Sequence, residues 1–337
     1  MLPIVAIFVA MLRGGISGEH LALAAAIGGV MIEAMRRAGY PPAFSATVIG
    51  SATATDILIP PSLAFVIYSI MVPGVSLPEL FAAGLMPGVL AGLALIVPAW
   101  WLSRRNGLGA SEASLARPPF WKSLKEASCG LVTPVLILGG MRAGWFTPTE
   151  AAVVAASWVI FIGVFIHKTI GPRQLYEIFA DGVRTSAVVM VILGFAGVFS
   201  YCIHTIGAVE PLVEWFRALD LGSLGTLAVV LLVFKLLGIF IEGVTLFLVF
   251  LPLLLPLIKL YAWNPVWFGV LMTMVMALGQ FTPPLAGTLL VSCRLAGVPI
   301  ESTLRWVGWF MLSFALAITA VLFAPGIALW LPRAAGF

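Results

Sequence analysis

The sequence predicts an all-α polytopic membrane protein. Of its 337 residues, 61% are hydrophobic and only 9% are charged, and the mean hydropathy is +1.12. An average soluble domain is roughly 45–50% apolar and about 25% charged, so a soluble fold would leave more apolar surface than its interior can hold. Disorder requires the opposite composition. The basic residues behind the net charge of +4 lie between apolar runs, which is typical of membrane-protein loops rather than of a nucleic-acid-binding surface.

Spanning helices are predicted where about 20 consecutive residues are predominantly apolar. Five runs qualify, and Pro325 and Gly326 are expected to break the last: Leu80–Leu102, Ala151–Ile166, Thr185–Ile203, Gly222–Ile241 and Leu304–Leu331. Three runs are shorter or more punctuated: Leu21–Met35, Cys129–Met141 and Val244–Ile258.

Two further apolar runs are interrupted at their centres by adjacent prolines. Pro60-Pro61 divides Ala43–Val72, and Pro283-Pro284 divides Val266–Cys293. Proline removes a backbone donor and ends the helix before it, and a bilayer tolerates irregular backbone only where protein or a water-filled cavity covers it. We expect two re-entrant hairpins with their tips near the membrane midplane. The alternative is a pair of kinked spanning helices.

The two interrupted runs lie in register with each other. A shift of 223 residues superposes several uncommon features, namely Glu19 on Glu242, Pro42 on Pro265, Pro60-Pro61 on Pro283-Pro284 and Gly74-Val75 on Gly297-Val298. This register predicts a first repeat at residues 1–102, a connecting loop with scaffold helices at 103–221, and a second repeat at 222–337. Secondary transporters are commonly built from such repeats, with the site where the broken segments meet.

The basic segments give conflicting signals about membrane orientation. Arg36-Arg37 and the loop Ser103–Ser128 are separated by one predicted hairpin and one span, so they are expected on opposite sides, whereas basic residues favour the cytoplasmic side. If every run spans, the repeats are parallel. Inverted repeats require one run that does not span, and Cys129–Met141 is the shortest candidate.

Polar residues are dense beside the first proline pair. Ser51, Thr53 and Asp56, with the carbonyls before Pro60 and Pro61, supply oxygen atoms of the kind that a hard cation such as Na⁺ binds. An ionisable residue at membrane depth is a functional-site candidate, so we interpret this segment as an ion site. The alternative is that the hydroxyls of Thr53 and Thr55 bond to helix carbonyls and that Asp56 is exposed at a turn.

The second proline pair has its own candidate residues. Glycine permits close backbone approach, threonine offers an oxygen, and a helix that starts after the prolines would point its amides at an anion. The alternative is a simple kink with glycine for packing. The candidates are Gly279, Thr282, Pro283, Pro284, Gly287 and Thr288.

Carboxylates at equivalent positions of the two halves form a third candidate. Ser17 and Glu19 precede a helix rich in small residues, and Glu242 occupies the matching place. Buried carboxylates there could bind cations or protons; equally, Glu19 could complement the positive start of the following helix. Thr147-Pro148-Thr149-Glu150 and Ser76-Leu-Pro-Glu79 have the pattern of helix N-termini rather than of catalytic groups. No hydrolase or ATPase motif is present, so transport would use an ion gradient.

With these motifs the chain resembles the large membrane subunit of tripartite ATP-independent periplasmic (TRAP) transporters, of the dicarboxylate and sialic-acid type. The resemblance extends in order over nearly the whole chain. Its stretches are Gly15-Ile-Ser-Gly18 through Arg37-Ala-Gly-Tyr40; Ile59-Pro-Pro-Ser62 with Ile67-Tyr68; Leu80-Phe81 through Gly84-Leu-Met-Pro-Gly88; Gly139-Gly140 through Phe146-Thr-Pro-Thr-Glu-Ala-Ala152; Asn264-Pro-Val-Trp-Phe-Gly269 through Thr282-Pro-Pro284; and Leu329-Trp-Leu-Pro332.

The resemblance implies a carrier of the bacterial inner membrane with an elevator mechanism, in which a mobile domain bearing both proline-split tips carries substrate and Na⁺ past a scaffold. It implies two partners, a small four-helix membrane subunit and a periplasmic substrate-binding protein, and an organic carboxylate anion as substrate. Thr53 with the carbonyls before Pro60, and Thr282 with those before Pro283, would each help to bind one Na⁺; Asp56 would add a charged ligand. No other cofactor is implied.

Three departures from the family pattern stand out. The family has additional helices before the point that matches Met1. Relatives usually have Gly-Pro where Asp56-Ile57 stands, and serine where Glu19 stands. The last two changes add negative charge near the expected ion site. Two other functions stay open from the sequence: a stand-alone ion-coupled anion carrier, and a membrane assembly subunit that does not transport.

Overall fold

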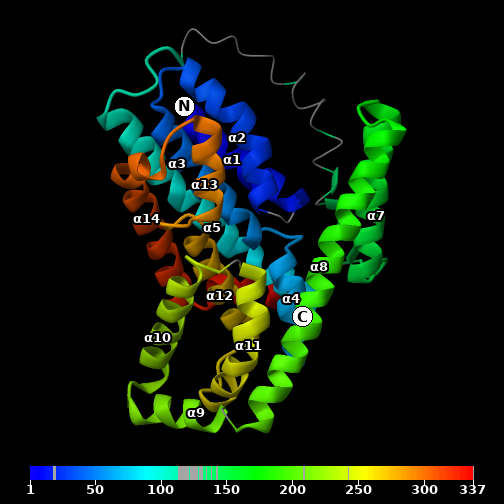
Figure 1. The fold of residues 1–337 in the computed structure, drawn as a ribbon, viewed down its shortest axis with the longest axis vertical. Helices are drawn as coiled ribbons and strands as arrows, with labels where there is room; N and C mark the ends of the chain where they lie inside the picture. Colours follow the sequence, from blue (N-terminus) through cyan, green and yellow to red (C-terminus); the bar gives the residue numbers. More distant parts are fainter. Residues whose placement is uncertain are drawn as a thin grey trace. The chain divides into compact units, whose positions relative to one another are not determined.

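The computed structural model describes residues 1–17, 20–112, 121, 128, 132, 133, 135–137, 139–141, 143–207, 209–241 and 243–336. These residues form helices and no strand, which confirms the predicted all-α class. Six of the described helical segments are long and apolar enough to cross a membrane: Pro42–Met71, Leu77–Arg105, Thr149–Ile166, Pro172–Ile203, Gly243–Leu260 and Ile300–Phe323. The chain divides into two compact units (Figure 1), the first made of Met1–Pro118, Leu227–Leu246 and Trp263–Phe337, and the second of Pro119–Thr226 and Phe247–Ala262.

The second unit contains α7 (Pro148–Phe161), the π-helical turn η3 (Ile162–Ile166), α8 (Pro172–Thr205) and α9 (Val209–Ala218). Thr147 caps α7 as predicted, because its backbone amide donates to Glu150 Oε2 at 2.8 Å while its hydroxyl accepts from the Glu150 amide. The beginning of α10 (Gly222–Leu237) and most of α11 (Gly243–Leu260) also belong here, and the Thr226 hydroxyl donates to Tyr261 Oη at 3.1 Å. Of the predicted short run Cys129–Met141, the structure describes residues 132, 133, 135–137 and 139–141, and all of these are helical.

The first unit begins with α1 (Leu2–Ser17) and α2 (His20–Arg37), which pack against each other. The first proline-split run forms α3 (Pro42–Thr53), the 3₁₀ turn η1 (Ala54–Leu58) and α4 (Leu63–Met71), followed by α5 (Leu77–Arg105). Ser76 caps α5, as its sequence pattern predicts, by accepting a hydrogen bond from the Glu79 amide at 3.3 Å.

The second half of the first unit contains α12 (Pro265–Gln280), α13 (Gly287–Ala296), the 3₁₀ turn η4 (Ile300–Thr303), α14 (Leu304–Phe323) and α15 (Gly326–Ala335). Asn264 caps α12 through its side-chain oxygen, which accepts from the Trp267 amide at 3.0 Å. The break between α14 and α15 falls at Ala324 and Pro325, where the sequence predicts it.

The run that contains Pro60-Pro61 leads from one end of the first unit to the other. The chain after α2 meets the chain after α5, because the Ser111 amide donates to Ala38 O at 3.3 Å and the Tyr40 hydroxyl donates to Glu112 Oε2 at 3.0 Å. The 29 residues of α5 span roughly 43 Å at 1.5 Å per residue, so α3–η1–α4 must first cover that distance in the opposite direction. The structure therefore agrees with the kinked-helix alternative and corrects the predicted hairpin.

The physical reason lies in the backbone at the break. Ile59 and Ser62 both have extended conformations, with φ/ψ of −94°/119° and −124°/126°. Proline interrupts helical hydrogen bonding, but extended residues carry the chain onward rather than reverse it. The helices that leave one end of the first unit and return to it are instead α1 and α2. The Met1 nitrogen, at the start of α1, lies 2.8 Å from Glu112 Oε1, and Glu112 also accepts a hydrogen bond from Tyr40, which follows α2.

The second broken helix runs antiparallel to the first. At the α4 end, the Tyr68 hydroxyl donates to Pro265 O at 2.6 Å, which places the start of α12 there. At the other end α13 packs against α2 and α3, and the two helices α3 and α13 lie side by side (Figure 1). Thus α3 packs on α13, and α12 packs on α4, so the first half of each broken helix lies against the second half of the other. These two segments are therefore inverted relative to each other.

This topology also corrects the expectation that the basic segments lie on opposite sides. Arg36 and Arg37 end α2, Arg104 and Arg105 end α5, and both helix ends lie at the same end of the first unit. The positive-inside rule predicts that this end faces the cytoplasm.

Cysteine labelling tests this crossing. In a chain whose native cysteines are replaced by serine, Arg36→Cys and Ser111→Cys are expected to react with a membrane-impermeant thiol reagent from the cytoplasmic side only, and the exposed Pro73→Cys from the opposite side only. Labelling of Arg36→Cys and Pro73→Cys from the same side would contradict the crossing and support a hairpin.

Candidate ion and substrate site at two broken helices

The first break is a fully enclosed polar segment. Ser51, Thr53, Thr55 and Asp56 have no exposed surface. The hydroxyls donate to carbonyls of the preceding turn, with Thr53 Oγ1 at 2.8 Å from Ile49 O and Thr55 Oγ1 at 2.7 Å from Ala52 O. This is the back-bonding that the alternative interpretation expects, yet each hydroxyl oxygen keeps lone pairs that can accept or coordinate. Asp56 is buried, not exposed at a turn.

The last turns of α1 close over the Asp56 carboxylate. A Cβ added to Gly14 would lie 2.6 Å from Asp56 Oδ1 and 3.1 Å from Asp56 Cα. Only glycine therefore allows this approach. Ser17 is the last residue of α1, and its side chain, like the whole of Glu19, lies outside the described residues.

The second break is shaped differently. After α12 ends at Gln280, the Thr282 hydroxyl donates to Leu278 O at 2.6 Å. Thr282 is buried, whereas Pro284 is exposed, and the left-handed Ala286 (φ +31°) precedes α13. The Pro60-Pro61 and Pro283-Pro284 peptide bonds are both cis.

Thr288 joins the two broken helices. Its hydroxyl oxygen lies 2.7 Å from Gly50 O of α3 and 3.0 Å from Gln280 O at the end of α12. Beside it, a Cβ added to Gly50 would lie only 2.7 Å from Leu289 Cα, so the backbones of α3 and α13 are in contact. The structure thus brings the two proline-split segments together, through α3, α13 and the packing of η1 on α12.

The start of α2 and the segment after α10 also pack against the second broken helix. A Cβ on Gly287 would lie 3.2 Å from Leu21, at the start of α2. The turn after α10 packs on α12, since a Cβ on Gly279 would lie 2.7 Å from Gly238 O and one on Gly243 would lie 2.5 Å from Met276 Cε. Glu242, next to Gly243, lies outside the described residues.

We call Ser51, Thr53, Asp56, Gln280, Thr282 and Thr288 the broken-helix site. Within residues 54–62 and 281–286, Asp56 is the sole ionisable side chain. A buried carboxylate needs a compensating cation, proton or donor, and the surrounding hydroxyl and carbonyl oxygens suit a hard cation. The broken-helix site therefore places a carboxylate and several oxygen atoms of the kind that a hard cation takes in an otherwise apolar interior.

Sequence reasoning passed over two features of this site. Gln280 is almost fully buried, and a polar amide within the apolar run of α12 is a detectable signal. The glycines at positions 14, 50 and 238 mark close backbone approaches, but glycine is frequent in this chain and its role here depends on the facing residue.

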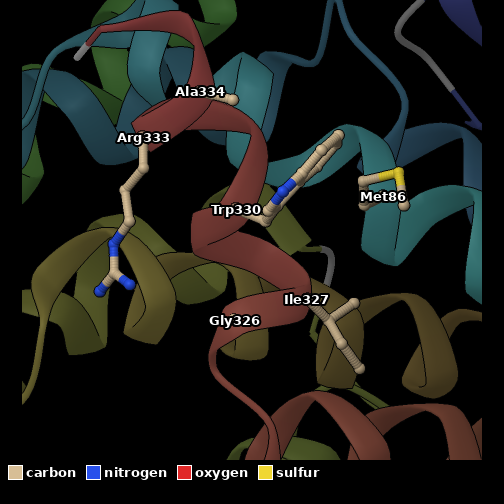
Figure 2. A pocket seen from close by; sticks show the side chains of 6 residues that line it. All are labelled: Met86, Gly326, Ile327, Trp330, Arg333 and Ala334. Carbon is tan, nitrogen blue, oxygen red and sulfur yellow. The ribbon is translucent and has the colours of Figure 1, made fainter.

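An open depression of about 700 Å³ lies elsewhere, between α5 and α15. Its lining residues are Met86, Gly326, Ile327, Trp330, Arg333 and Ala334. Figure 2 shows Trp330 directed toward Met86 and Arg333 directed away from it. Gly84 and Gly88 lie on one face of α5 and contact Leu58 and Ile59 beside the first break. Met86 is two residues from each of them, so it lies on the opposite face of α5, away from the broken-helix site.

Comparison with known proteins identifies a shared family. The family model described as the tripartite ATP-independent periplasmic transporter, DctM component, matches residues 1–327. The chain is 33% identical to the sialic acid TRAP transporter large permease protein SiaM of Vibrio cholerae, over 97% of this chain and 76% of that protein. It is 32% identical to the C4-dicarboxylate large permease DctM of Pseudomonas aeruginosa, over 98% of this chain and 77% of that protein.

A third relative is longer. The isethionate TRAP transporter permease protein DctMQ of Oleidesulfovibrio alaskensis is 32% identical over 86% of this chain, which spans 46% of that protein.

Proposed function

We propose, from the premise that this chain belongs to the DctM component family of tripartite ATP-independent periplasmic transporters, that it takes up an organic anion by coupling its movement to Na⁺. The family and the six apolar helices make it a multi-pass protein of the bacterial inner membrane. The observation that carries the coupling proposal is the buried Asp56 carboxylate among hydroxyl and carbonyl oxygens, at the point where two antiparallel broken helices meet.

The bound cation would do two things at this site. It would lie beside the Asp56 carboxylate and lower the cost of burying that charge, and it would add positive charge where the described break segments contain no lysine or arginine. A substrate carboxylate would then meet the cation, hydroxyls such as that of Thr282, and the amides at the start of α13. Ion and anion would bind together, because each improves the electrostatic environment of the other.

The contact between α3 and α13 supports movement of the two breaks as one body. The Thr288 hydroxyl of α13 is hydrogen-bonded to Gly50 O of α3 and to Gln280 O at the end of α12, and Gly50 allows direct backbone contact between α3 and α13. Interfaces packed this closely do not deform continuously. We propose that an elevator movement would carry both breaks together, with the ion and the anion between them.

The substrate class follows from the relatives. Isethionate, sialic acid and C4-dicarboxylates, named for three of them, are all organic acids that are anionic at neutral pH. We propose an organic anion, with a carboxylate as the leading candidate, and two partners: a small membrane subunit and a periplasmic substrate-binding protein. The cognate binding protein, screened against organic acids by thermal stabilisation, would identify the anion.

Reconstitution tests this proposal. In proteoliposomes that contain this chain and its small membrane subunit, uptake of the anion is expected only when the cognate binding protein and an inward Na⁺ gradient are both present. Replacement of Na⁺ by choline should reduce uptake to background. Uptake without the binding protein would contradict the tripartite function and support a stand-alone carrier, and absence of uptake under all conditions would support an assembly role.

A further inference from the structure

Arginines and tryptophans gather where α5 ends and α14 begins. The Arg104 and Arg105 guanidinium carbons lie 4.8 and 5.0 Å from the ring centroids of Trp100 and Trp101. On α14, the Arg305 guanidinium carbon lies 4.1 Å from the Trp306 ring centroid. We call these residues, together with Trp309, the arginine–tryptophan cluster.

The cluster forms one continuous surface because α5 and α14 are in contact there. The rings of Trp101 and Trp309 pack edge to face with centroids 4.9 Å apart. The helices α5 and α14 run antiparallel, because α15, which follows α14, packs near the first half of α5. Arg105 follows Trp101 by one turn and Arg305 precedes Trp309 by one turn, so both arginines lie at the same end of the first unit. That end also carries the basic end of α2, and the positive-inside rule assigns it to the cytoplasm.

The arginines of the cluster, Arg104, Arg105 and Arg305, have no ion-pair partner among the carboxylates that the structure describes. The nearby end of α2 is different: Arg36 and Arg37 both pair with Glu33 at 2.8 and 2.9 Å. The Arg37 hydrogen bond is the main cause that holds the pKa of Glu33 below its usual value. The cluster therefore offers cationic groups that the end of α2 does not.

An exposed apolar stripe continues from the cluster along both helices. On α5 it contains Val97 and Leu93, one and two turns before Trp101, and on α14 it contains Leu312 and Leu316, after Trp309. Val97 and Leu316 are each 62% exposed. Guanidinium groups beside an apolar stripe match a molecule with an anionic head and long acyl chains.

We infer that the arginine–tryptophan cluster is a binding site for an anionic phospholipid of the cytoplasmic leaflet. Guanidinium groups bind phosphate through bidentate, charge-assisted hydrogen bonds, and tryptophan rings favour the level of the head groups. The acyl chains would cover Leu93 and Val97 on α5 and Leu312 and Leu316 on α14. A zwitterionic lipid offers the same phosphate and would cover the apolar stripe, but its ammonium group offsets the negative charge, so it would leave the positive charge of the arginines uncompensated.

Lipid titration of the purified full chain tests this inference. Dioleoyl phosphatidylglycerol is expected to raise the Tm in detergent more than dioleoyl phosphatidylcholine does. The triple variant R104Q/R105Q/R305Q should bind phosphatidylglycerol roughly tenfold or more weakly and lose the difference between the two lipids. The variant R173Q/R184Q/R333Q removes the same charge elsewhere and should respond as the unmodified chain does.

A second measurement keeps the inference falsifiable if the triple variant folds poorly. Brominated phosphatidylglycerol should quench the fluorescence of the unmodified chain more than brominated phosphatidylcholine does. Trp100→Phe with Trp309→Phe should remove that difference, because exposed tryptophans outside the cluster, such as Trp215 and Trp330, are quenched by either lipid. Equal Tm responses to both lipids, an unchanged response in R104Q/R105Q/R305Q, or a quenching difference that survives the loss of both tryptophans would overturn it. So would a phosphatidylglycerol response that disappears when the small membrane subunit is added, because the partner would then cover the cluster.

Discussion

If uptake is coupled to Na⁺ as proposed, Asp56→Asn is expected to weaken that coupling strongly. The substitution keeps the shape of the side chain but removes the charge of a fully buried carboxylate. Interactions that involve a charged group contribute about 1.5–3 kcal/mol, so Na⁺ binding should weaken roughly 10- to 150-fold. The half-saturating Na⁺ concentration in reconstituted uptake should rise by that factor, and stabilisation of the purified chain by Na⁺ should be lost.

Two controls separate this effect from a change in folding. Asp181→Asn alters an exposed carboxylate on α8 that pairs with Arg184 at 3.1 Å, and it should leave Na⁺ dependence unchanged. Gly14→Ala leaves Asp56 in place but crowds its carboxylate, and should weaken Na⁺ binding in the same direction. Asp56→Asn with unaltered Na⁺ dependence and uptake rate would exclude Asp56 from the ion site.

Gly50→Ala is expected to destabilise the protein although alanine is the better helix former. The added Cβ would lie 2.7 Å from Leu289 Cα and 3.1 Å from Leu289 N, and backbone atoms cannot move aside as a side chain can. Overpacking of this kind costs about 1–3 kcal/mol. The Tm should fall, and because α3 and α13 would be forced apart at the Thr288 hydrogen bond, uptake should fall with it.

The matched control is Gly29→Ala on α2, where an added Cβ meets nothing within 4 Å. There the same substitution should stabilise the helix by about 0.5–1 kcal/mol, so the two variants should shift Tm in opposite directions. A thermal melt of each purified variant in one detergent measures this. A Gly50→Ala chain with unchanged or raised Tm would show that α3 and α13 do not touch at Leu289.

The sequence located most helices and the two helix breaks, but it assigned the reversal of the chain to the wrong places. Pro60-Pro61 and Pro283-Pro284 do interrupt helices, as predicted, yet Ile59 and Ser62 carry the chain onward in extended conformations. The pair that returns to its starting end is α1–α2, joined by two residues beside Ser17.

The site residues divide in a similar way. The oxygen-rich character of Ser51, Thr53 and Asp56 can be read from the sequence, because polar side chains in an apolar run are conspicuous. The contact of Asp56 with Gly14, and of Thr288 with Gly50, joins residues 42 and 238 positions apart. No local pattern specifies such pairs, since each depends on how whole helices pack.

By itself the sequence determined that this protein is an all-helical membrane protein and that two of its helices are broken. The composition and the length of the apolar runs determine the first property and the proline pairs the second, and all of these act through local chemistry. Only the tertiary structure decided the direction in which each broken helix runs, the end where the arginines gather and the partners of the buried polar groups. Those properties arise from contacts between distant segments, and a proline pair breaks a helix with the same chemistry whether the chain turns back or continues.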